Sequence, residues 1–269
     1  MSFASERAGS AVALNPCIER NELKRVKEAF WHKLRTSGLD SHLMSLVEVL
    51  EPSARIFVVG GFLRDCARQV QECKQIDPKD LDVVVDTELL SHALYKIGAR
   101  FTTTPLGGYR WQPYGAGAWM DMWQLKDTIW LRDKTGALSI WDYLAGVDLN
   151  IDRIAFDFQG NVLCDDGCLA GLASHTIDLD ATIHVEHLLP YELVRAVVAH
   201  IKTSYAVTSR VTRLIKRCDA MTLAKAGEER LPYDGYGEEM LTTIRAVMQS
   251  IRVHGGCAAE QKGIRRWSP

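Results

Sequence analysis

Two neighbouring stretches decide the fold of this chain: RIFVVGGFLRD at residues 55–65 and DLDVVVD at residues 80–86. Residues 55–59 are apolar and rich in β-branched side chains, and the run stops at Gly60 and Gly61, so we expect a buried strand that enters a tight turn. Residues 62–73 have helical composition, and residues 81–86 form a second β-branched run. The order of strand, turn, helix and strand indicates a domain of mixed α and β structure.

Asp80 and Asp82 flank Leu81 at the start of the second expected strand. Because side chains alternate between the two faces of a strand, both carboxylates point to the same side. Two such groups repel one another and persist most readily where a cation neutralises them. Their oxygen ligands suit magnesium, which binds through carboxylates together with substrate phosphates. Pairs of aspartates are also common on plain protein surfaces, so this spacing alone has low specificity.

Asp121 stands among apolar and aromatic neighbours in AWMDMWQL, residues 118–125, which we expect to form a third strand. If that strand lies beside residues 80–86, Asp121 completes a triad of carboxylates. Two metal ions held about 4 Å apart by such a triad can activate an attacking hydroxyl and stabilise a leaving pyrophosphate. We therefore predict Asp80, Asp82 and Asp121 as catalytic residues and as the ligands of a two-magnesium site.

The segment GGFLRD, residues 60–65, supplies the other half of the expected site. Gly60 and Gly61 let the backbone approach a phosphate closely, and the helix that follows offers unpaired amides at its N-terminus. Arg64 adds positive charge. A Gly-Gly pair can equally be an ordinary turn from strand to helix, so the argument depends on its combination with the aspartates.

This combination resembles the head domain of class II CCA-adding enzymes and bacterial poly(A) polymerases, which belong to the DNA-polymerase-β-like nucleotidyltransferase superfamily. The family motif GGxxRD is matched by Gly60, Gly61, Arg64 and Asp65, and its DxD motif follows at Asp80. The resemblance covers roughly residues 50–218. It implies an α+β fold, with a small mixed sheet flanked by helices and a C-terminal helical neck, and it implies nucleotide-binding roles for these four residues.

Two later family motifs are matched less completely. Residues 146–157 resemble the segment RRDFTxNAMAYD, with Asp148 at the position of its first Asp, but its arginines are absent and its Asn is Asp152. Arg153 and Arg195 are the candidates to replace those arginines as phosphate ligands. The base-selecting motif EDxxR falls at YELVR, where Arg195 matches the Arg and Tyr191 replaces the Glu. The resemblance thus implies nucleotide-binding roles for Asp148, Arg153 and Arg195, but not CCA addition itself.

Periodicity along the chain suggests three regions. Residues 1–50 should hold N-terminal helices that pack on the head, residues 51–185 the nucleotidyltransferase head, and residues 186–269 a helical neck-like region. We expect two amphipathic helices within residues 20–50, broken near Gly38, and a helix N-cap at Thr208 or Ser209. Residues 102–117 read as a long loop, residues 128–133 and 153–158 as strands, and residues 159–167 as a turn-rich connection.

Composition and charge bound the cellular setting and the partners. A chain of 269 residues with 47% hydrophobic and 25% charged residues is typical of a globular protein. Its seven cysteines lack paired spacing, and no apolar run has signal-peptide or membrane-spanning length, so we expect a cytoplasmic protein without membrane contact. Residues 186–269 carry a net charge of +4 against −6 for the rest. This difference suits a metal site in the first part of the chain and a phosphate-bearing partner at the second, but differences of this size also arise by chance.

These features predict a metal-dependent enzyme that transfers a nucleoside monophosphate from an NTP to a hydroxyl, on a tRNA-like RNA 3' end, with release of pyrophosphate. The alternatives are a degenerate family member that binds nucleotide or RNA without turnover, and transfer to a small molecule or a protein. Because little sequence follows the neck for gripping tRNA, we expect either a smaller substrate or another protein or subunit that presents it. The hydrolase motifs GxSxG and HExxH do not occur, and the strand-to-helix turn matches neither GxxxxGK[ST] nor GxGxxG.

Overall fold

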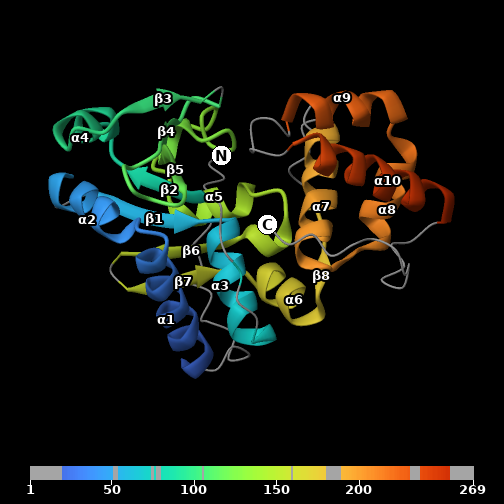
Figure 1. The fold of residues 1–269 in the computed structure, drawn as a ribbon, viewed down its shortest axis with the longest axis horizontal. Coiled ribbons are helices and arrows are strands. Elements are labelled where there is room, and N and C mark those ends of the chain that lie inside the picture. Colours follow the sequence, from blue (N-terminus) through green and yellow to red (C-terminus); the bar gives the residue numbers. More distant parts are fainter. Residues whose placement is uncertain are drawn as a thin grey trace, which may run out of the picture.

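The computed structural model describes residues 20–50, 54–73, 76, 80–104, 106–158, 160–179, 189–230 and 237–254. Figure 1 shows a twisted sheet with its helices in one half of the molecule and a group of helices, α7 to α10, in the other. The expected domain boundaries at residues 50–51 and 185–186 touch or lie in stretches outside the described residues.

The sheet contains seven described strands in the order β3-β4-β5-β2-β1-β6-β7. The strands β2 and β5 are parallel, and the other neighbouring strands are antiparallel. The strands that the sequence predicts at residues 55–59, 80–86, 118–125 and 153–158 are therefore confirmed. Their bounds are β1 Arg55–Val59, β2 Asp80–Asp86, β3 Phe101–Thr103, β4 Tyr109–Trp111, β5 Trp119–Gln124, β6 Ile154–Asp157 and β7 Asn161–Cys164.

Helices cover both faces of the sheet. On one face Leu81, Val83 and Val85 of β2 join a core formed with α1 to α4. On the other face Val84 packs into a smaller core under α5, together with Phe57. The helices of this part are α1 Arg20–Thr36, α2 Asp40–Val49, α3 Gly61–Glu72, α4 Leu90–Lys96, α5 Ile140–Gly146 and α6 Asp166–Ser174, with short 3-10 turns at Leu125–Asp127 and Asn150–Asp152.

The N-terminal helices pack on the sheet as the periodicity predicts. They are broken at Gly38, whose φ of +70° lies in the left-handed region that glycine tolerates. Phe30 of α1 is fully buried and its ring packs on those of Phe62 and Phe156, at centroid distances of 5.8 and 4.4 Å. Aromatic burial of this kind fixes α1 across α3 and β6.

The remaining helices form the second half of the molecule. They are α7 Leu189–Thr203, α8 Ser209–Arg217, α9 Ala220–Arg230 and α10 Glu238–His254. The Thr208 hydroxyl accepts a hydrogen bond from the Val211 backbone N–H, which confirms one of the two expected caps. A short parallel pair, β8 Thr176–Ile177 with β9 Ala206–Val207, joins this part to the chain that leaves α6.

Three local predictions were wrong. Residues 102–117 are not one long loop, because β3 and β4 pair as a hairpin that continues the sheet beyond β5. Residues 128–133 form turns instead of a strand, and residues 159–167 contain the strand β7 and the start of α6.

No helix in the described part of the chain combines the length and apolarity needed to cross a membrane.

Candidate active site

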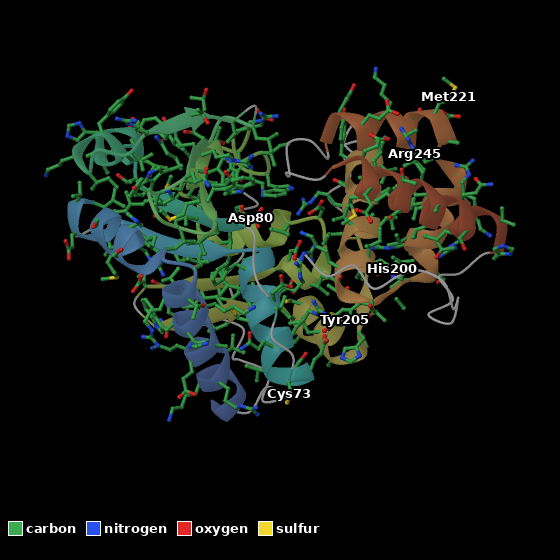
Figure 2. The ribbon with its side chains drawn as sticks, viewed as in Figure 1. Cys73, Asp80, His200, Tyr205, Met221 and Arg245 are labelled. Atoms are coloured by element: carbon green, nitrogen blue, oxygen red, sulfur yellow. The ribbon has the colours of Figure 1, made fainter. Side chains whose placement is uncertain are left out.

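The site is built on the row of residues that crosses the middle of the sheet. Asp82 on β2 pairs in register with Asp121 on β5, and Asp80 pairs with Trp119. Because Leu81 and Val83 face the larger core, Asp80 and Asp82 lie together on the opposite face. The condition under which Asp121 would join Asp80 and Asp82, that its strand lies beside the DLD strand, is thus met. Figure 2 labels Asp80 at the part of the sheet nearest to the helices α7 to α10.

Negative charge accumulates at Asp82. Its partial burial, and after that the neighbouring carboxylates of Asp80 and Asp121, raise the pKa of Asp82 well above its ordinary value, while Arg195 opposes this shift. The hydroxyl of Tyr143 on α5 also lies close enough for Asp82 to affect it: burial first and then the Asp82 charge raise the pKa of Tyr143. A carboxylate in such surroundings favours either a proton or a cation.

Asp121 is not the unpaired carboxylate that its apolar neighbours suggest. Arg110 on β4 lies opposite Asp121 in register. Its Nε donates to Asp121 Oδ1 at 2.7 Å and its Nη2 donates to Oδ2 at 2.5 Å. The same guanidinium lies over the ring of Trp119 at 4.8 Å. Sequence reasoning missed this partner because it placed Arg110 in a loop.

The Gly60-Gly61 turn brings the backbone against the aspartates. Gly60 has a φ of +71° and a ψ of −140°, a combination that only glycine adopts readily. A Cβ at this position would lie 3.1 Å from Asp82 Oδ2. Gly61 begins α3, so the amides of the first helical turn start beside the carboxylate row. The turn therefore brings the backbone close to Asp82, and the predicted approach to a phosphate stays a prediction.

Arg64 and Asp65 lie in an ion-pair network at the start of α3. Arg64 is buried; its Nε donates to Asp65 Oδ1 at 3.0 Å and its Nη1 donates to Asp152 Oδ1 at 2.7 Å. Burial disfavours the charge of Arg64, but Asp65 and Asp152 outweigh it and raise the pKa of Arg64. In the sequence Asp152 stands out only as a departure from a family motif, and its pairing with a residue 88 positions away leaves no signal there.

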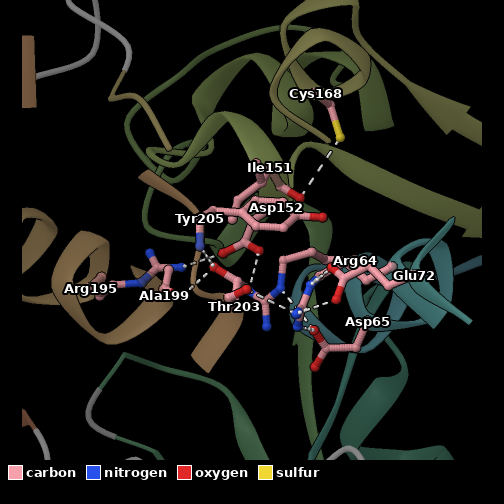
Figure 3. Close-up of polar contacts among 11 residues, drawn as sticks. Arg64, Asp65, Glu72, Ile151, Asp152, Cys168, Arg195, Ala199, Thr203 and Tyr205 are labelled. Carbon is pink, nitrogen blue, oxygen red and sulfur yellow. Dashed lines mark hydrogen bonds and ion pairs between the residues drawn. The ribbon is translucent and has the colours of Figure 1, made fainter. Parts of the chain in front are cut away.

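Asp148 and Arg195 are brought together as a pair. Arg195 on α7 donates from Nη1 to both Asp148 oxygens at 2.7 Å, and its Nη2 lies 3.5 Å from Asp152 Oδ2. Figure 3 shows Arg64 and Arg195 reaching Asp152 from two sides. Asp152 therefore connects α3 with α7.

Arg153 lies apart from this network. Its Nε donates to the Val147 carbonyl at 2.9 Å, and its Nη1 donates to Asp165 Oδ2 at 3.2 Å. The structure thus brings together the other predicted site residues but directs this guanidinium toward the start of α6.

Lys202 of α7 is a neighbour of the site, and it lies in the C-terminal region, residues 186–269, whose net charge is positive. Burial first, and then the nearby Arg64, lower the pKa of Lys202, while Asp80, Asp65 and Asp152 act in the opposite direction. Its ammonium group therefore lies among the charges that surround Asp80. A helical periodicity that alternates apolar and basic residues could not reveal this, because it does not say which basic side chain turns toward the sheet.

The donor set fits a hard divalent cation. Asp80 and Asp82 offer carboxylate oxygens on one face, with an excess of negative charge between them. Among the described residues, no three acidic, histidine or cysteine side chains are arranged to hold a metal ion as they stand. The third expected ligand, Asp121, has both oxygens bound by Arg110.

No protein-family model and no curated protein sequence matches this chain. Its structure is similar to a solved tRNA nucleotidyltransferase complexed with a primer tRNA and an incoming ATP analog, with 18% identity, 78% of this chain and 60% of that chain covered, and a TM-score of 0.52. A CCA-adding enzyme solved with CTP is 19% identical, with 78% of this chain and 54% of that chain covered and a TM-score of 0.52. An apo tRNA-processing enzyme is 16% identical, with 83% of this chain and 61% of that chain covered and a TM-score of 0.51.

The chain spans between 54% and 61% of the length of these three solved structures. At such low identity the likeness concerns the arrangement of strands and helices. The mixed sheet with its flanking helices is therefore arranged like the corresponding part of these tRNA nucleotidyltransferases, which is the fold class that the resemblance in the sequence predicts.

Proposed function

We propose that this protein is a metal-dependent nucleotidyltransferase, which transfers a nucleoside monophosphate from an NTP to the hydroxyl of an RNA 3' end and releases pyrophosphate. The observation that carries the proposal is the register of β2 with β5, which places Asp82 opposite Asp121 and keeps Asp80 on the same face. A fold similar to that of solved tRNA nucleotidyltransferases supports it.

In this proposal Asp80, Asp82 and Asp121 hold Mg²⁺. When bound, the two ions would activate the attacking hydroxyl and stabilise the charge of the leaving pyrophosphate. Gly60 and Gly61 present the first turn of α3 to the triphosphate, and a Cβ at Gly60 would crowd Asp82 at 3.1 Å.

The helix α7 contributes positive charge from the other side. Lys202 lies among the charges around Asp80, which suits it to a phosphate of the NTP. Arg195 of α7 pairs with Asp148 beside this cluster, and these two residues are further proposed nucleotide contacts. Arg64 and Asp65 fix the helix start that carries the amides. We leave Arg153 out of the nucleotide site, because its guanidinium is bound to Val147 and Asp165.

An RNA acceptor is supported by the charge of α8. Arg213, Lys216 and Arg217 are exposed on this helix, where they can contact phosphates. The tRNA nucleotidyltransferase similar in structure was solved with a primer tRNA. We propose the same class of acceptor for this chain, and a partner protein that presents it remains part of the proposal.

A second candidate function is binding of a nucleotide or RNA without turnover. It is favoured by the ion pair of Arg110 with Asp121, which engages the third expected metal ligand with a protein cation. The two candidates differ in whether label enters the acceptor covalently.

The test is incorporation from each of the four radiolabelled NTPs, with Mg²⁺, into total cellular RNA. Wild type is compared with the double variant Asp80→Asn plus Asp82→Asn, which keeps the size of both side chains. Asp86→Asn is the matched control, because Asp86 is an exposed aspartate on the same strand. We expect incorporation by wild type and by the control, and a loss of at least about a thousandfold in the double variant, since both proposed ligands of the ions are gone.

The result also identifies the preferred base. Wild-type binding of NTP without incorporation into RNA, either alone or with cell extract as a source of partner proteins, would contradict transfer to RNA and favour the binding function. Incorporation that persists in the double variant would exclude the aspartate pair as the catalytic centre.

A further inference from the structure

Arg110 holds Asp121 in a geometry that uses both carboxylate oxygens. Nε and Nη2 of the guanidinium donate to Oδ1 and Oδ2 at 2.7 and 2.5 Å. Asp121 is only 6% exposed, and the Arg110 side chain is 26% exposed. A bidentate pair in partly buried surroundings is one of the stronger charge-assisted interactions in proteins.

The backbone and a neighbouring ring both fix Arg110 in this place. The pairing of β4 with β5 places Arg110 opposite Asp121, so the side chain begins on the correct face. Trp119 lies two residues before Asp121 on the same face of β5, and its ring supports the guanidinium at 4.8 Å. The pairing is therefore built into the sheet and differs from a chance contact of a surface side chain.

A metal ion and Arg110 need the same atoms of Asp121. The guanidinium occupies one acceptor site on each oxygen of Asp121, about half of the sites that a carboxylate offers, and two positive charges at this distance repel one another. Arginine does not lose its proton in proteins, so the repulsion is not relieved by titration of Arg110. A metal ion can therefore use both oxygens of Asp121, without a neighbouring positive charge, only after the guanidinium has moved.

We propose that Arg110 is a positioning residue that competes with a divalent cation for Asp121, so that the ion shared by Asp82 and Asp121 binds only when Arg110 is displaced. This inference depends on the proposed function, because it assigns Asp121 to a metal site. The ligand class that can displace Arg110 is a nucleoside polyphosphate, since phosphate oxygens match the guanidinium fork as carboxylate oxygens do.

The experiment measures Mn²⁺ binding to the purified full chain without nucleotide, by electron paramagnetic resonance of free Mn²⁺. Arg110→Ala removes the competitor, and Arg110→Gln removes the charge while keeping most of the side-chain length. We expect both variants to bind Mn²⁺ at least about tenfold more tightly than wild type. A neighbouring arginine shifts the proton affinity of a carboxylate by about one to three powers of ten, and we expect the guanidinium of Arg110 to weaken cation binding at Asp121 in the same way. Thermal unfolding of each variant checks that it is folded.

Arg55 offers a closely matched control. It lies over the ring of Phe57 at 4.9 Å and donates to the buried Asp157 at 2.7 Å, so Arg55→Ala removes an arginine of the same kind from another part of the sheet. We expect its Mn²⁺ affinity to equal that of wild type. In the background of Asp121→Asn, Arg110→Ala should no longer change the affinity, because the shared ligand is absent.

Equal Mn²⁺ affinity in wild type, Arg110→Ala and Arg110→Gln would overturn the competition. If Asp80→Asn plus Asp82→Asn still abolished binding in that case, the proposed metal site would stand and only the role of Arg110 would be wrong. Absence of Mn²⁺ binding in every folded variant would overturn the metal site and the inference together. An equal gain in Arg55→Ala would show a general charge effect and would also overturn the inference.

Discussion

The guanidinium of Arg195 donates from one nitrogen to both oxygens of Asp148 at 2.7 Å, although the two residues lie 47 positions apart. The pair joins α7 to the chain that enters β6, and a second nitrogen of Arg195 lies 3.5 Å from Asp152. The helical half of the molecule is thus tied to the sheet by charge at the edge of the proposed site.

Replacing Arg195 by Met should destabilise the protein. Asp148 is 3% exposed, whereas the side chain of Arg195 is 28% exposed. Leaving the buried carboxylate of Asp148 without its cation should lower the free energy of unfolding by about 2–4 kcal/mol. Urea denaturation of Arg195→Met measures this loss. Arg213→Met, at an exposed position on α8, should change the free energy of unfolding by less than about 0.5 kcal/mol. Similar values for the two variants would contradict the importance of the pair.

Gly60→Ala should impair both stability and the site. The backbone at Gly60 is unfavourable for alanine, at a cost of about 1–3 kcal/mol, and the added methyl group would meet Asp82 Oδ2 at 3.1 Å. Gly98→Ala is the control, because Gly98 has the same φ of +71° but no atom within 4 Å of the added Cβ. We expect Mn²⁺ affinity, measured by titration, to fall in Gly60→Ala and to stay at the wild-type value in Gly98→Ala.

Asp82→Asn should make the metal-free protein more stable at neutral pH. The substitution removes one of the carboxylates that repel each other around Asp82, and a gain of about 0.5–2 kcal/mol is typical where a functional site is relieved of such strain. Differential scanning calorimetry in the presence of a chelator measures the change in melting temperature. Asp86→Asn, on the exposed end of the same strand, should give no comparable gain. A lower melting temperature for Asp82→Asn would refute the prediction.

Asp65 should make the stability depend on acid pH. Burial acts against its charge, but Arg64, Arg68 and Lys202 together lower the pKa of Asp65. A carboxyl whose pKa is lowered in the folded state contributes stability above its unfolded pKa of about 3.9, and this contribution is lost as the pH falls through the folded value.

Asp65→Asn should therefore lose about 1–3 kcal/mol at pH 7, and its difference from wild type should narrow below about pH 4. Urea denaturation at several pH values tests this dependence. Asp127→Asn, at an exposed site, serves as the control. A difference that stays constant with pH would indicate that packing, and not charge, explains the effect of the substitution.

The sequence was most informative where one face of an element is buried. Alternation along β2 placed Asp80 and Asp82 on one side, and the apolar neighbours of Asp121 identified β5 as a strand. Both predictions depend on the pleat of a strand, which is a local property. Proximity of the two strands could only be stated as a condition, because strand pairing depends on the whole sheet.

The parts that escaped prediction depend on short elements and distant pairs. The strands β3 and β4 have three residues each, too few for alternation to stand out among glycines and prolines. With β4 missed, the partner of Asp121 was missed too. The pairing of Arg64 with Asp152 joins segments 88 positions apart, and the sequence shows two charges but not their contact. We retain the division at residues 51–185 and 186–269 as a proposal.

The β3-β4 hairpin lies at one end of the strand order and joins the sheet through β5. A hairpin of another sequence but the same register could therefore place a neutral, acidic or bulky side chain opposite Asp121, while β5, β2 and β1 keep their own pairing. The charge opposite Asp121 is then set by a segment at the edge of the sheet, and it can change as long as Trp111 is kept, because this buried residue of β4 belongs to the same core as Leu81 and Val83.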